Sequence, residues 1–564
     1  EIGSGLVGSE MCIRDSDYMP LLLALSFTDK DGVVCHLVND IPESDWQDAV
    51  QIVGWLYQYY NTEPKEQVFA NLKKNIKISA ANIPAATQLF TPDWIVRYMV
   101  ENSLGRLWSE GHPDFDKSEW KYYLDEAPQE PQVAQQLAEL RKGYAALTPE
   151  DIKCIDPCMG SGHILAYLFD VLMQIYRSAG YGDRDAAASV VEHNLYGLDI
   201  DDRAAQMAYF VVMMKGCQYD SRFLRRHLNP HVYAIQESNG INRNQLKFFG
   251  NGLSDFERNE ARLQLEGLLD TLTNAKEYGS ILNMENYNWA LLRSCADAAG
   301  EDAQLSMDSF GLADTVAQLK QLIDIGEALG QKYDVVVTNP PYMAPTERQK
   351  PYLLENFIDS KNDMAMAFIE KCISSCKPNG YSALIVFPTW MFLSSYEKLR
   401  TKIIKQNTIS CMVYPGRGIF GSDFGSTSFV INRNRIYGYK GSYSKLFKTI
   451  GEVAPQEVRE QQFLSGMGRY VISQQNFLKI PGNPMAFWIS NNFLKTFDEK
   501  KIADISVAKA GIVSGNDPYF LRLWHEVDCE KITKDAVNFE DHTAYRWVPV
   551  SYTHLRAHET GAYL

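Results

Sequence analysis

The chain has 564 residues, of which 45% are apolar, and ten cysteines that form no CxxC pair. This length predicts roughly two to four domains, no apolar run reaches the roughly 18 residues of a membrane span, and scattered thiols argue against a disulfide framework or a zinc site. We therefore expect a cytoplasmic protein with no membrane segment and no metal. A net charge of −15 argues against simple wrapping of a polyanion.

The two ends of the chain differ from the rest in character. Residues 1–16 and 551–564 resemble translated sequencing-adapter tails of the kind found on assembled environmental sequences. Neither has the features of a targeting signal, and both are left out of the fold prediction. On this interpretation the natural sequence starts near residue 17, and the chain is an internal fragment of a longer protein.

The first predicted region, residues 17–108, is mostly helical in its pattern. Within it, Thr91 can cap a helix that has Pro92 at its first position. Residues 109–150 are polar and acidic, with a short helical run from 132 to 144. We interpret them as an insertion before the main domain.

Residues 153–165 indicate a strand, a loop rich in glycine and the start of a long apolar helix. Glycines at such a turn let the backbone approach a ligand, and the helix N-terminus favours negative charge. A phosphate loop fits less well, because GxxxxGK[ST] is absent and GxGxxG is incomplete. The candidate ligand loop comprises Asp156, Pro157, Gly160, Ser161 and Gly162.

Two further strands are predicted after this helix. Residues 195–201 form an apolar run that ends in acid, and Asp199 is favoured over Asp201 because it ends the run. A carboxylate at this point can accept both hydroxyls of a ribose. Residues 231–239 indicate a third strand with a polar end. Residues 251–330 then show helical spacing with many acids, which predicts a helical insert of unknown purpose.

A run of β-branched residues within 333–342 predicts a short buried strand, which two prolines end because they cannot donate to a ladder. The Asn339 side-chain oxygen and the Pro340 carbonyl can both accept from an amino group on a flat ring. Pro340 and Pro341 hold these acceptors still, and Tyr342 offers a face for stacking. A plain proline turn is the simpler interpretation of Asn-Pro-Pro alone, but the apolar strand and the aromatic residue favour a binding site.

A helix from 363 to 377 and a strand from 381 to 388 follow. Strands and helices alternate from 155 to 431, which indicates a doubly wound α/β domain with its sites at the carboxyl ends of the strands. We place this catalytic domain at residues 151–450.

Basic residues gather late in that domain. Residues 398–448 contain ten lysines and arginines and one acid, a local charge of +9, and since the whole chain has −15, the rest carries −24. A solvated basic face is one interpretation. The interleaved Tyr437, Tyr439 and Tyr443 favour a surface that follows a nucleic-acid backbone.

The Asn-Pro-Pro-Tyr sequence and the Asp-Pro-x-x-Gly-Ser-Gly loop together resemble the motifs of amino-methyltransferases that use S-adenosylmethionine, chiefly the adenine-N6 DNA methyltransferases. The motif order over residues 85–525 and the large inserts resemble the adenine methyltransferase component of BREX phage-exclusion systems. The resemblance implies a Rossmann-like class I methyltransferase fold and site-specific methylation of adenine N6 in duplex DNA. It also implies a role in phage defence or restriction-modification, with other proteins of a defence complex as partners.

The resemblance also implies roles for individual residues. Thr91 and Pro92 would close over the methionine end of the cofactor, the glycine loop and Asp199 would hold the rest of it, and Glu237 would contact its adenine. A flipped adenine base would stack on Tyr342, with Phe420 as the first choice for the opposite face and Phe424 as the second.

The remaining sequence and two alternatives complete the prediction. Residues 451–550 resemble the start of a target-recognition domain, with its opening segment at 509–522. One alternative is a protein-glutamine or ribosomal-RNA amino-methyltransferase, although those enzymes are usually compact. The other is a module that binds cofactor to regulate DNA recognition in a defence complex without transferring a methyl group.

Overall fold

The computed structural model describes residues 29–30, 32–40, 42, 90–284, 286–298, 312–420, 424–499 and 522–532. It divides into two compact units, residues 1–494 and 495–564. In the second unit the described residues include the short turns Trp524–Glu526 and Cys529–Lys531. Most of the helical region predicted at 17–108 lies outside the described residues, which there include helices α3 (Val33–Asn39), α8 (Asp93–Val100) and α9 (Arg106–Gly111).

The first unit is built on one mixed sheet, whose strand order is β3-β2-β1-β4-β5-β7-β6-β8-β9 in the described part of the chain. The strands are β1 (Cys154–Asp156), β2 (Leu195–Asp199), β3 (His231–Ala234), β4 (Tyr333–Thr338), β5 (Cys376–Val386), β6 (Thr408–Arg417), β7 (Gly425–Asn432), β8 (Lys440–Lys445) and β9 (Arg469–Ser473). The strands β3, β2, β1, β4 and β5 run parallel to one another, and β7 runs antiparallel to both β5 and β6. The doubly wound α/β prediction is confirmed.

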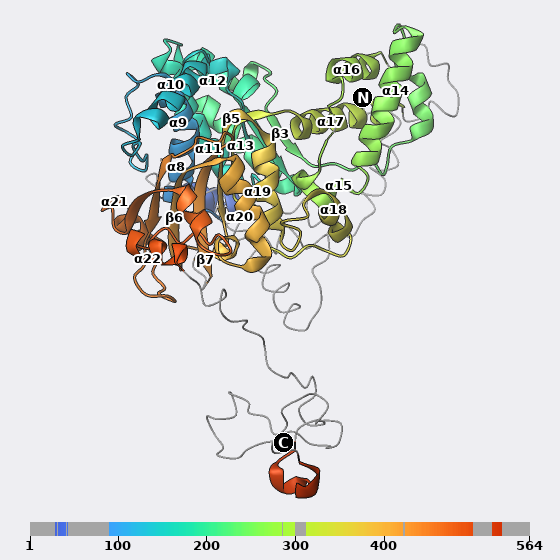
Figure 1. The fold of residues 1–564 in the computed structure, drawn as a ribbon. Coiled ribbons are helices and arrows are strands. Elements are labelled where there is room, and N and C mark those ends of the chain that lie inside the picture. The colour runs from blue at the N-terminus through green and yellow to red at the C-terminus, as the bar shows by residue number, and fades with distance from the viewer. Residues whose placement is uncertain are drawn as a thin grey trace. The chain divides into compact units, whose positions relative to one another are not determined.

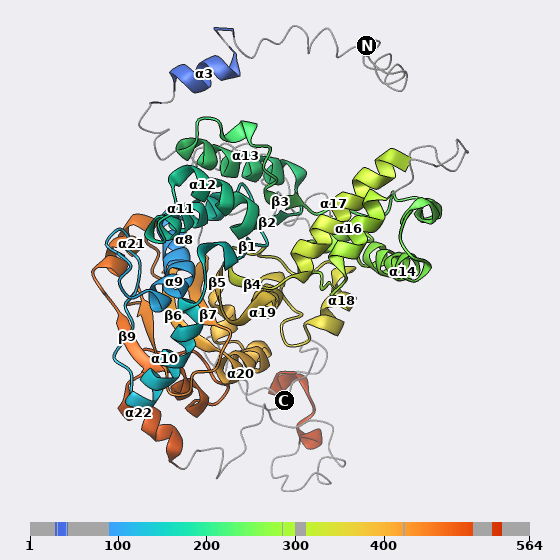
Figure 2. The same ribbon diagram turned by 90° about the horizontal axis from the view of Figure 1, so that it is seen from above.

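Helices cover both faces of this sheet, as Figures 1 and 2 show. The side chains of Val335 and Val337 join one hydrophobic cluster and that of Val336 joins the other, because successive residues of a strand point to opposite faces. The first face packs on α8, α11 (His163–Ser178), α12 (Asp183–Ser189) and α13 (Asp202–Tyr219). The second packs on α19 (Met364–Ser375) and α20 (Glu397–Gln406).

Two stretches predicted to be helical, one before the first strand and one before β4, contain helices in the structure. The run at 132–144 is α10 (Pro131–Ala145). The insert at 251–330 contains α14 (Asp255–Thr271), α15 (Ala275–Tyr278), α16 (Trp289–Asp297) and α17 (Leu312–Gly330). Both figures show α14, α16 and α17 grouped together to one side of the sheet.

Two element boundaries differ from the prediction. The helix expected to reach 377 ends at Ser375, and β5 begins at Cys376, so Pro378 lies inside the strand instead of stopping a helix. The register against β4 shifts at this point, and Asn379 has a φ of +67°, so the strand absorbs the proline through an irregular start. The third strand ends at Ala234, five residues before its predicted end.

Beyond β8, the chain continues in the same compact unit. Helix α21 (Gln456–Leu464) precedes β9, the last strand of the sheet, and the boundary between the two units falls after Leu494. Residues 451–494, predicted as part of a recognition domain, therefore pack with the sheet domain. The remaining α-helices of the described residues are the short helices α18 (Gln349–Asn356) and α22 (Asn491–Lys495). Among the described residues, no helix has the length and apolar character to cross a membrane.

Candidate functional site

The two predicted motifs meet where β1 and β4 end. The order of the strands reverses between these two neighbours, which is where open α/β sheets form their ligand sites. The Thr338 hydroxyl, at the end of β4, donates a 2.7 Å hydrogen bond to Asp156 Oδ1, at the end of β1. Asn339 and Pro157 are the next residues along each chain segment. The Asn-Pro-Pro-Tyr turn and the glycine loop are therefore neighbours at one edge of the sheet.

Thr91 lies against the first of these motifs. Asn339 Nδ2 donates a 3.0 Å hydrogen bond to Thr91 Oγ1, and the Thr91 side chain is fully buried. The bond uses the amide nitrogen of Asn339, so it turns the amide oxygen, the hydrogen-bond acceptor, the other way. The predicted capping role of Thr91 is wrong, because Pro92 is extended with a ψ of 138° and α8 begins at Asp93.

Hydrogen bonds hold the glycine loop against β1 and β2. The Cys158 amide donates to Asp156 Oδ1 at 3.0 Å, and the Gly160 amide donates to Asp199 Oδ2 at 2.9 Å. Asp199 Oδ1 accepts from the Asp201 amide at 2.9 Å. Asp199 therefore lies at the loop, as predicted, and positions it directly. Its proposed contact with a ribose would use the remaining lone pairs of the carboxylate.

The two motif glycines serve different purposes. Gly160 has a φ of +53°, and a Cβ added there would meet no atom within 4 Å, so its side faces open space. Gly162 has a φ of +85°, and a Cβ there would lie 2.8 Å from Ala208 Cα in α13. Gly160 thus leaves room beside the loop, whereas Gly162 permits close packing of two helices. Ser161, between them, is buried.

The acids of the loop lie in a site without a basic neighbour. Burial raises the pKa of Asp156 to about 7 and the pKa of Asp199 to about 6. Asp156 Oδ2 is buried and has no hydrogen-bond partner, and neither carboxylate forms an ion pair within the described residues. A buried carboxylate with an unused oxygen favours a positively charged ligand or a hydrogen-bond donor. These acceptor oxygens therefore fit a ligand that carries hydroxyls and a cationic centre.

His163, the first residue of α11, is a site residue that the sequence reasoning missed. Its ring stacks on Phe90 with a centroid distance of 4.5 Å, next to the Thr91-Pro92 segment. Both ring nitrogens are buried and lack a hydrogen-bond partner among the described residues. Burial lowers the pKa of His163 to about 4, so the neutral ring offers one donor and one acceptor. The signal in the sequence was a histidine directly after Gly-Ser-Gly.

Four aromatic rings gather at the end of β4 and β5. Tyr342 lies 4.5 Å from Phe387, 6.3 Å from Phe420 and 6.2 Å from Phe424, between ring centroids. The Tyr342 hydroxyl donates to the Ile385 carbonyl at 2.8 Å, which fixes the ring against β5. The structure thus brings both predicted phenylalanines to Tyr342. Phe387, which follows β5 as Asn339 follows β4, is an addition to the predicted set.

Glu237 and two of the three interleaved tyrosines do not lie where their predicted roles require. Glu237 is exposed, and its hydrogen bond is with Asn239 at 3.4 Å; no described contact joins it to Asp199 or the glycine loop. Tyr439 and Tyr443 are buried in the core, so they do not form part of the predicted nucleic-acid surface. Of the three interleaved tyrosines, Tyr437 is the exposed one.

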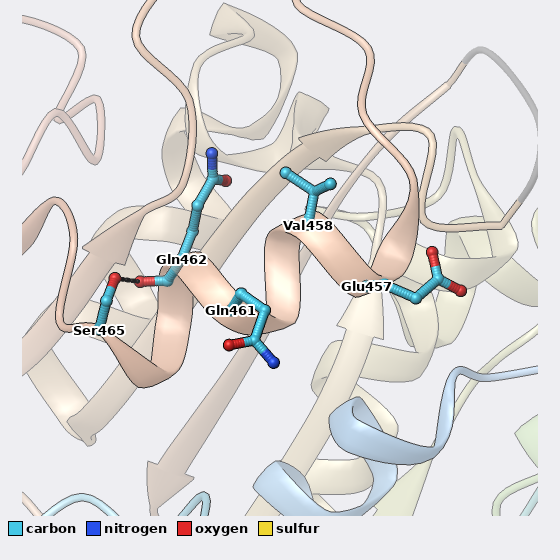
Figure 3. A pocket seen from close by; sticks show the side chains of 5 residues that line it. All are labelled: Glu457, Val458, Gln461, Gln462 and Ser465. Atoms are coloured by element: carbon cyan, nitrogen blue, oxygen red, sulfur yellow. Dashed lines mark hydrogen bonds between the residues drawn. The ribbon is translucent and has the colours of Figure 1, made fainter.

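A hollow of about 450 Å³ lies elsewhere, on α21 (Figure 3). Its lining side chains are Glu457, Val458, Gln461, Gln462 and Ser465. The Ser465 hydroxyl donates to the Gln462 carbonyl at 2.8 Å, which closes the end of the helix. The hollow contains none of the predicted site residues, so we place the candidate site at the ends of β1 and β4. No metal-ligand cluster of three or more acids, histidines or cysteines occurs among the residues that the structure describes.

Comparison with known proteins shows which families the chain is similar to. Residues 193–420 match the family model of the Eco57I restriction-modification methylase. The chain is 35% identical to the adenine-specific methyltransferase PglX of Lacticaseibacillus casei (strain Zhang), over 96% of this chain and 46% of that protein. It is 34% identical to the adenine-specific methyltransferase BrxX of Escherichia coli O9:H4 (strain HS), over 95% of this chain and 45% of that protein.

Among solved structures, the chain is similar to a nuclease-deletion mutant of the Type ISP restriction-modification enzyme LlaGI in complex with a DNA substrate mimic. The identity is 12% and the TM-score 0.42, and the match covers 77% of this chain and 29% of that chain. The chain spans about half the length of the curated relatives it matches. The matched residues 193–420 include Asp199 and the Asn-Pro-Pro-Tyr turn, whereas Thr91 and the glycine loop come before them.

Proposed function

We propose that this protein is a site-specific DNA methyltransferase that transfers a methyl group from S-adenosylmethionine to adenine N6 in duplex DNA. The observation that carries the proposal is the Thr338–Asp156 hydrogen bond. It holds the Asn-Pro-Pro-Tyr turn, which would bind the amino group, next to the glycine loop, which would bind the cofactor. The similar proteins PglX and BrxX are named adenine-specific methyltransferases. We further propose a cytoplasmic role in marking self DNA within a phage-defence or restriction-modification system.

The cofactor would lie along the glycine loop. Asp199 would accept from the ribose hydroxyls, and the open side of Gly160 would admit the adenosyl group. The unused oxygen of Asp156 and the neutral His163 ring would face the methionine end, whose ammonium and carboxylate need an acceptor and a donor. Thr91 and Pro92 would close over that end. When bound, S-adenosylmethionine supplies a methyl group on a positively charged sulfur, which a nitrogen lone pair can displace.

The target base would enter beside Tyr342. Extrusion of an adenine from the duplex costs about a few kcal/mol. Stacking on Tyr342 and on Phe420 or Phe424 would recover roughly 1–3 kcal/mol for each face. These rings now contact one another at steep angles of 78° and 84°, so a base can enter only if they separate. Phe387 would then support Tyr342 from behind.

Asn339 and Pro340 would act on the amino group itself. The Asn339 oxygen and the Pro340 carbonyl would accept the two N6 hydrogens, which aims the nitrogen lone pair at the methyl group. Thr91 holds the Asn339 amide in the orientation this requires. A strong base is not needed, because the nitrogen loses its proton after the new bond has formed.

Two other functions remain alternatives. A protein-glutamine or ribosomal-RNA methyltransferase would use the same turn, but the large helical insert and the basic stretch favour DNA. A module that binds cofactor without transfer, and so regulates DNA recognition in a defence complex, would also keep every motif. This second alternative predicts cofactor binding with no product.

The product identifies the function directly. The protein would be incubated with duplex DNA and S-adenosylmethionine that carries a deuterated methyl group, with and without partner proteins of the defence system. Nucleosides from the digested DNA would then be analysed by mass spectrometry, and we expect labelled N6-methyladenine. Label in RNA or in glutamine would support the first alternative. Cofactor binding without any label, under both conditions, would support the second.

A further inference from the structure

The basic stretch at 398–448 contributes less free charge than its sequence suggests. Lys402 pairs with Glu370 at 2.6 Å, and Lys440 pairs with Glu130 at 2.7 Å. Arg400 is buried and donates to backbone carbonyls, including that of Trp390 at 2.8 Å. These residues stabilise the fold. A contact with a polyanion must therefore depend on the other basic residues of the stretch.

The direction of the strands separates these other residues. Strand β6 runs parallel to β8, and both run in the direction of β4 and β5, because β7 is antiparallel to β5 and β6. Lys445 ends β8 and Arg417 ends β6, so both lie at the edge of the sheet that carries Asn339. Lys440, at the start of β8, lies at the opposite edge. The edge with the candidate site thus has its own basic side chains.

Aromatic rings surround Lys445 at this edge. Its Nζ lies 4.6 Å from the ring centroid of Trp488 and 4.7 Å from that of Phe447. Tyr414 lies 4.7 Å from Phe447 and 6.3 Å from Trp488, and Phe392 lies 5.9 Å from Trp488. We name this group the aromatic-lysine face: Phe392, Tyr414, Lys445, Phe447 and Trp488.

The aromatic-lysine face is accessible and close to the base site. Phe392 is 38% exposed, Tyr414, Lys445 and Trp488 are half-buried, and Phe447 is the buried member of the group. Lys445 forms no ion pair among the described residues, in contrast to Lys440. The short helix Pro388–Met391 connects Phe387 of the base site to Phe392. Phe392, Tyr414 and Trp488 pack toward the interior on one side and keep the rest of their rings exposed near this cation.

We propose that the aromatic-lysine face binds unpaired nucleotides of the DNA next to the extruded adenine. Bases stack on aromatic rings without regard to sequence, and a lysine beside them neutralises a phosphate. Charge selects this occupant, because an acidic chain repels DNA from most of its surface and a locally basic edge with exposed rings attracts it. The inference rests on the proposed function and extends it to a second contact with the substrate.

The test measures binding of two fluorescein-labelled probes, a 20-nucleotide oligothymidylate and a 20-base-pair duplex, by fluorescence anisotropy. We expect Trp488→Ala and Tyr414→Ala each to weaken oligothymidylate binding about tenfold, with a smaller effect on the closed duplex. Lys445→Gln should lower the slope of log Kd against log salt concentration by about 0.7, the value for one phosphate of a single strand.

The controls come from the same strand and the same rings. Lys440→Gln, at the other end of β8, should change neither the affinity nor the salt slope, because Glu130 already neutralises that lysine. Trp488→Phe should retain most of the binding, and thermal melting and S-adenosylhomocysteine affinity identify any variant that is misfolded. Phe392→Ala, at the most exposed ring, provides a further variant with little effect on folding.

The inference is overturned if folded Trp488→Ala and Tyr414→Ala proteins bind oligothymidylate as the unmodified chain does and Lys445→Gln behaves like Lys440→Gln. Failure of the proposed function has a different signature. In that case the unmodified protein produces no labelled N6-methyladenine, whatever the variants of this face bind.

Discussion

At the scale of single residues, the site depends on the orientation of one amide. Asn339 directly follows the buried strand β4, and its side-chain nitrogen donates to Thr91, a residue 248 positions earlier in the chain. The sequence predicted both residues as part of a site, one for the amino group and one for the cofactor. It could not predict that they touch, because the contact depends on how the segment before α8 packs against β4.

Thr91→Val removes the acceptor of this bond and keeps the shape of the side chain. The Asn339 amide is then free to rotate, and we expect the methyl-transfer rate to fall roughly ten- to a hundredfold. Affinity for S-adenosylhomocysteine, measured by titration calorimetry, should change little. Thr91→Ser, which keeps the hydroxyl, should restore most of the rate. Equal rates for the valine variant and the unmodified protein would rule out this positioning role.

His163 allows a test of where the methionine end of the cofactor lies. Loss of a neutral hydrogen bond is worth about 1 kcal/mol, so His163→Ala should weaken S-adenosylhomocysteine binding roughly threefold to tenfold. Methylthioadenosine, which lacks the amino-acid end, is the matched control ligand and should bind both proteins equally. A similar loss for both ligands would show that His163 only supports the fold of the loop.

At the scale of elements, the glycine loop borders open space at Gly160 and packs closely against α13 at Gly162. The sequence located this loop, β2 and β4 closely, because short apolar runs bounded by glycine, proline or acid have few alternative structures. The start of β5 was missed, because Pro378 was interpreted as the end of a helix, whereas pairing with β4 on either side of an irregular turn places it inside the strand. Phe387 was missed as well, because its role depends on β5 lying beside β4.

The two glycines of the loop predict different outcomes. Gly160→Ala places a methyl group in open space, at a strained positive φ, so it should lower S-adenosylhomocysteine affinity with a small change in melting temperature. Gly162→Ala forces a contact with the backbone of α13, so it should lower the melting temperature of the whole domain. Differential scanning fluorimetry and calorimetric titration separate the two effects. The reverse assignment would show that the ligand lies against Gly162.

At the scale of the whole molecule, the direction of the strands decides where the basic residues lie. The acidic composition argued against simple wrapping of a polyanion, and the structure distributes the basic stretch over both edges of the sheet, with two of its lysines, Lys402 and Lys440, in ion pairs. Sequence alone could count these charges but could not assign them to an edge. The chain spans about half the length of its curated relatives.

The measurement that tests the central claim most directly compares the unmodified protein with Asn339→Ala. Both are assayed for transfer of a labelled methyl group to adenine N6 in duplex DNA and for affinity for S-adenosylhomocysteine. We predict that the variant binds this ligand as the unmodified protein does and transfers methyl at least about a hundredfold more slowly. Full transfer by a folded Asn339→Ala protein would contradict the account.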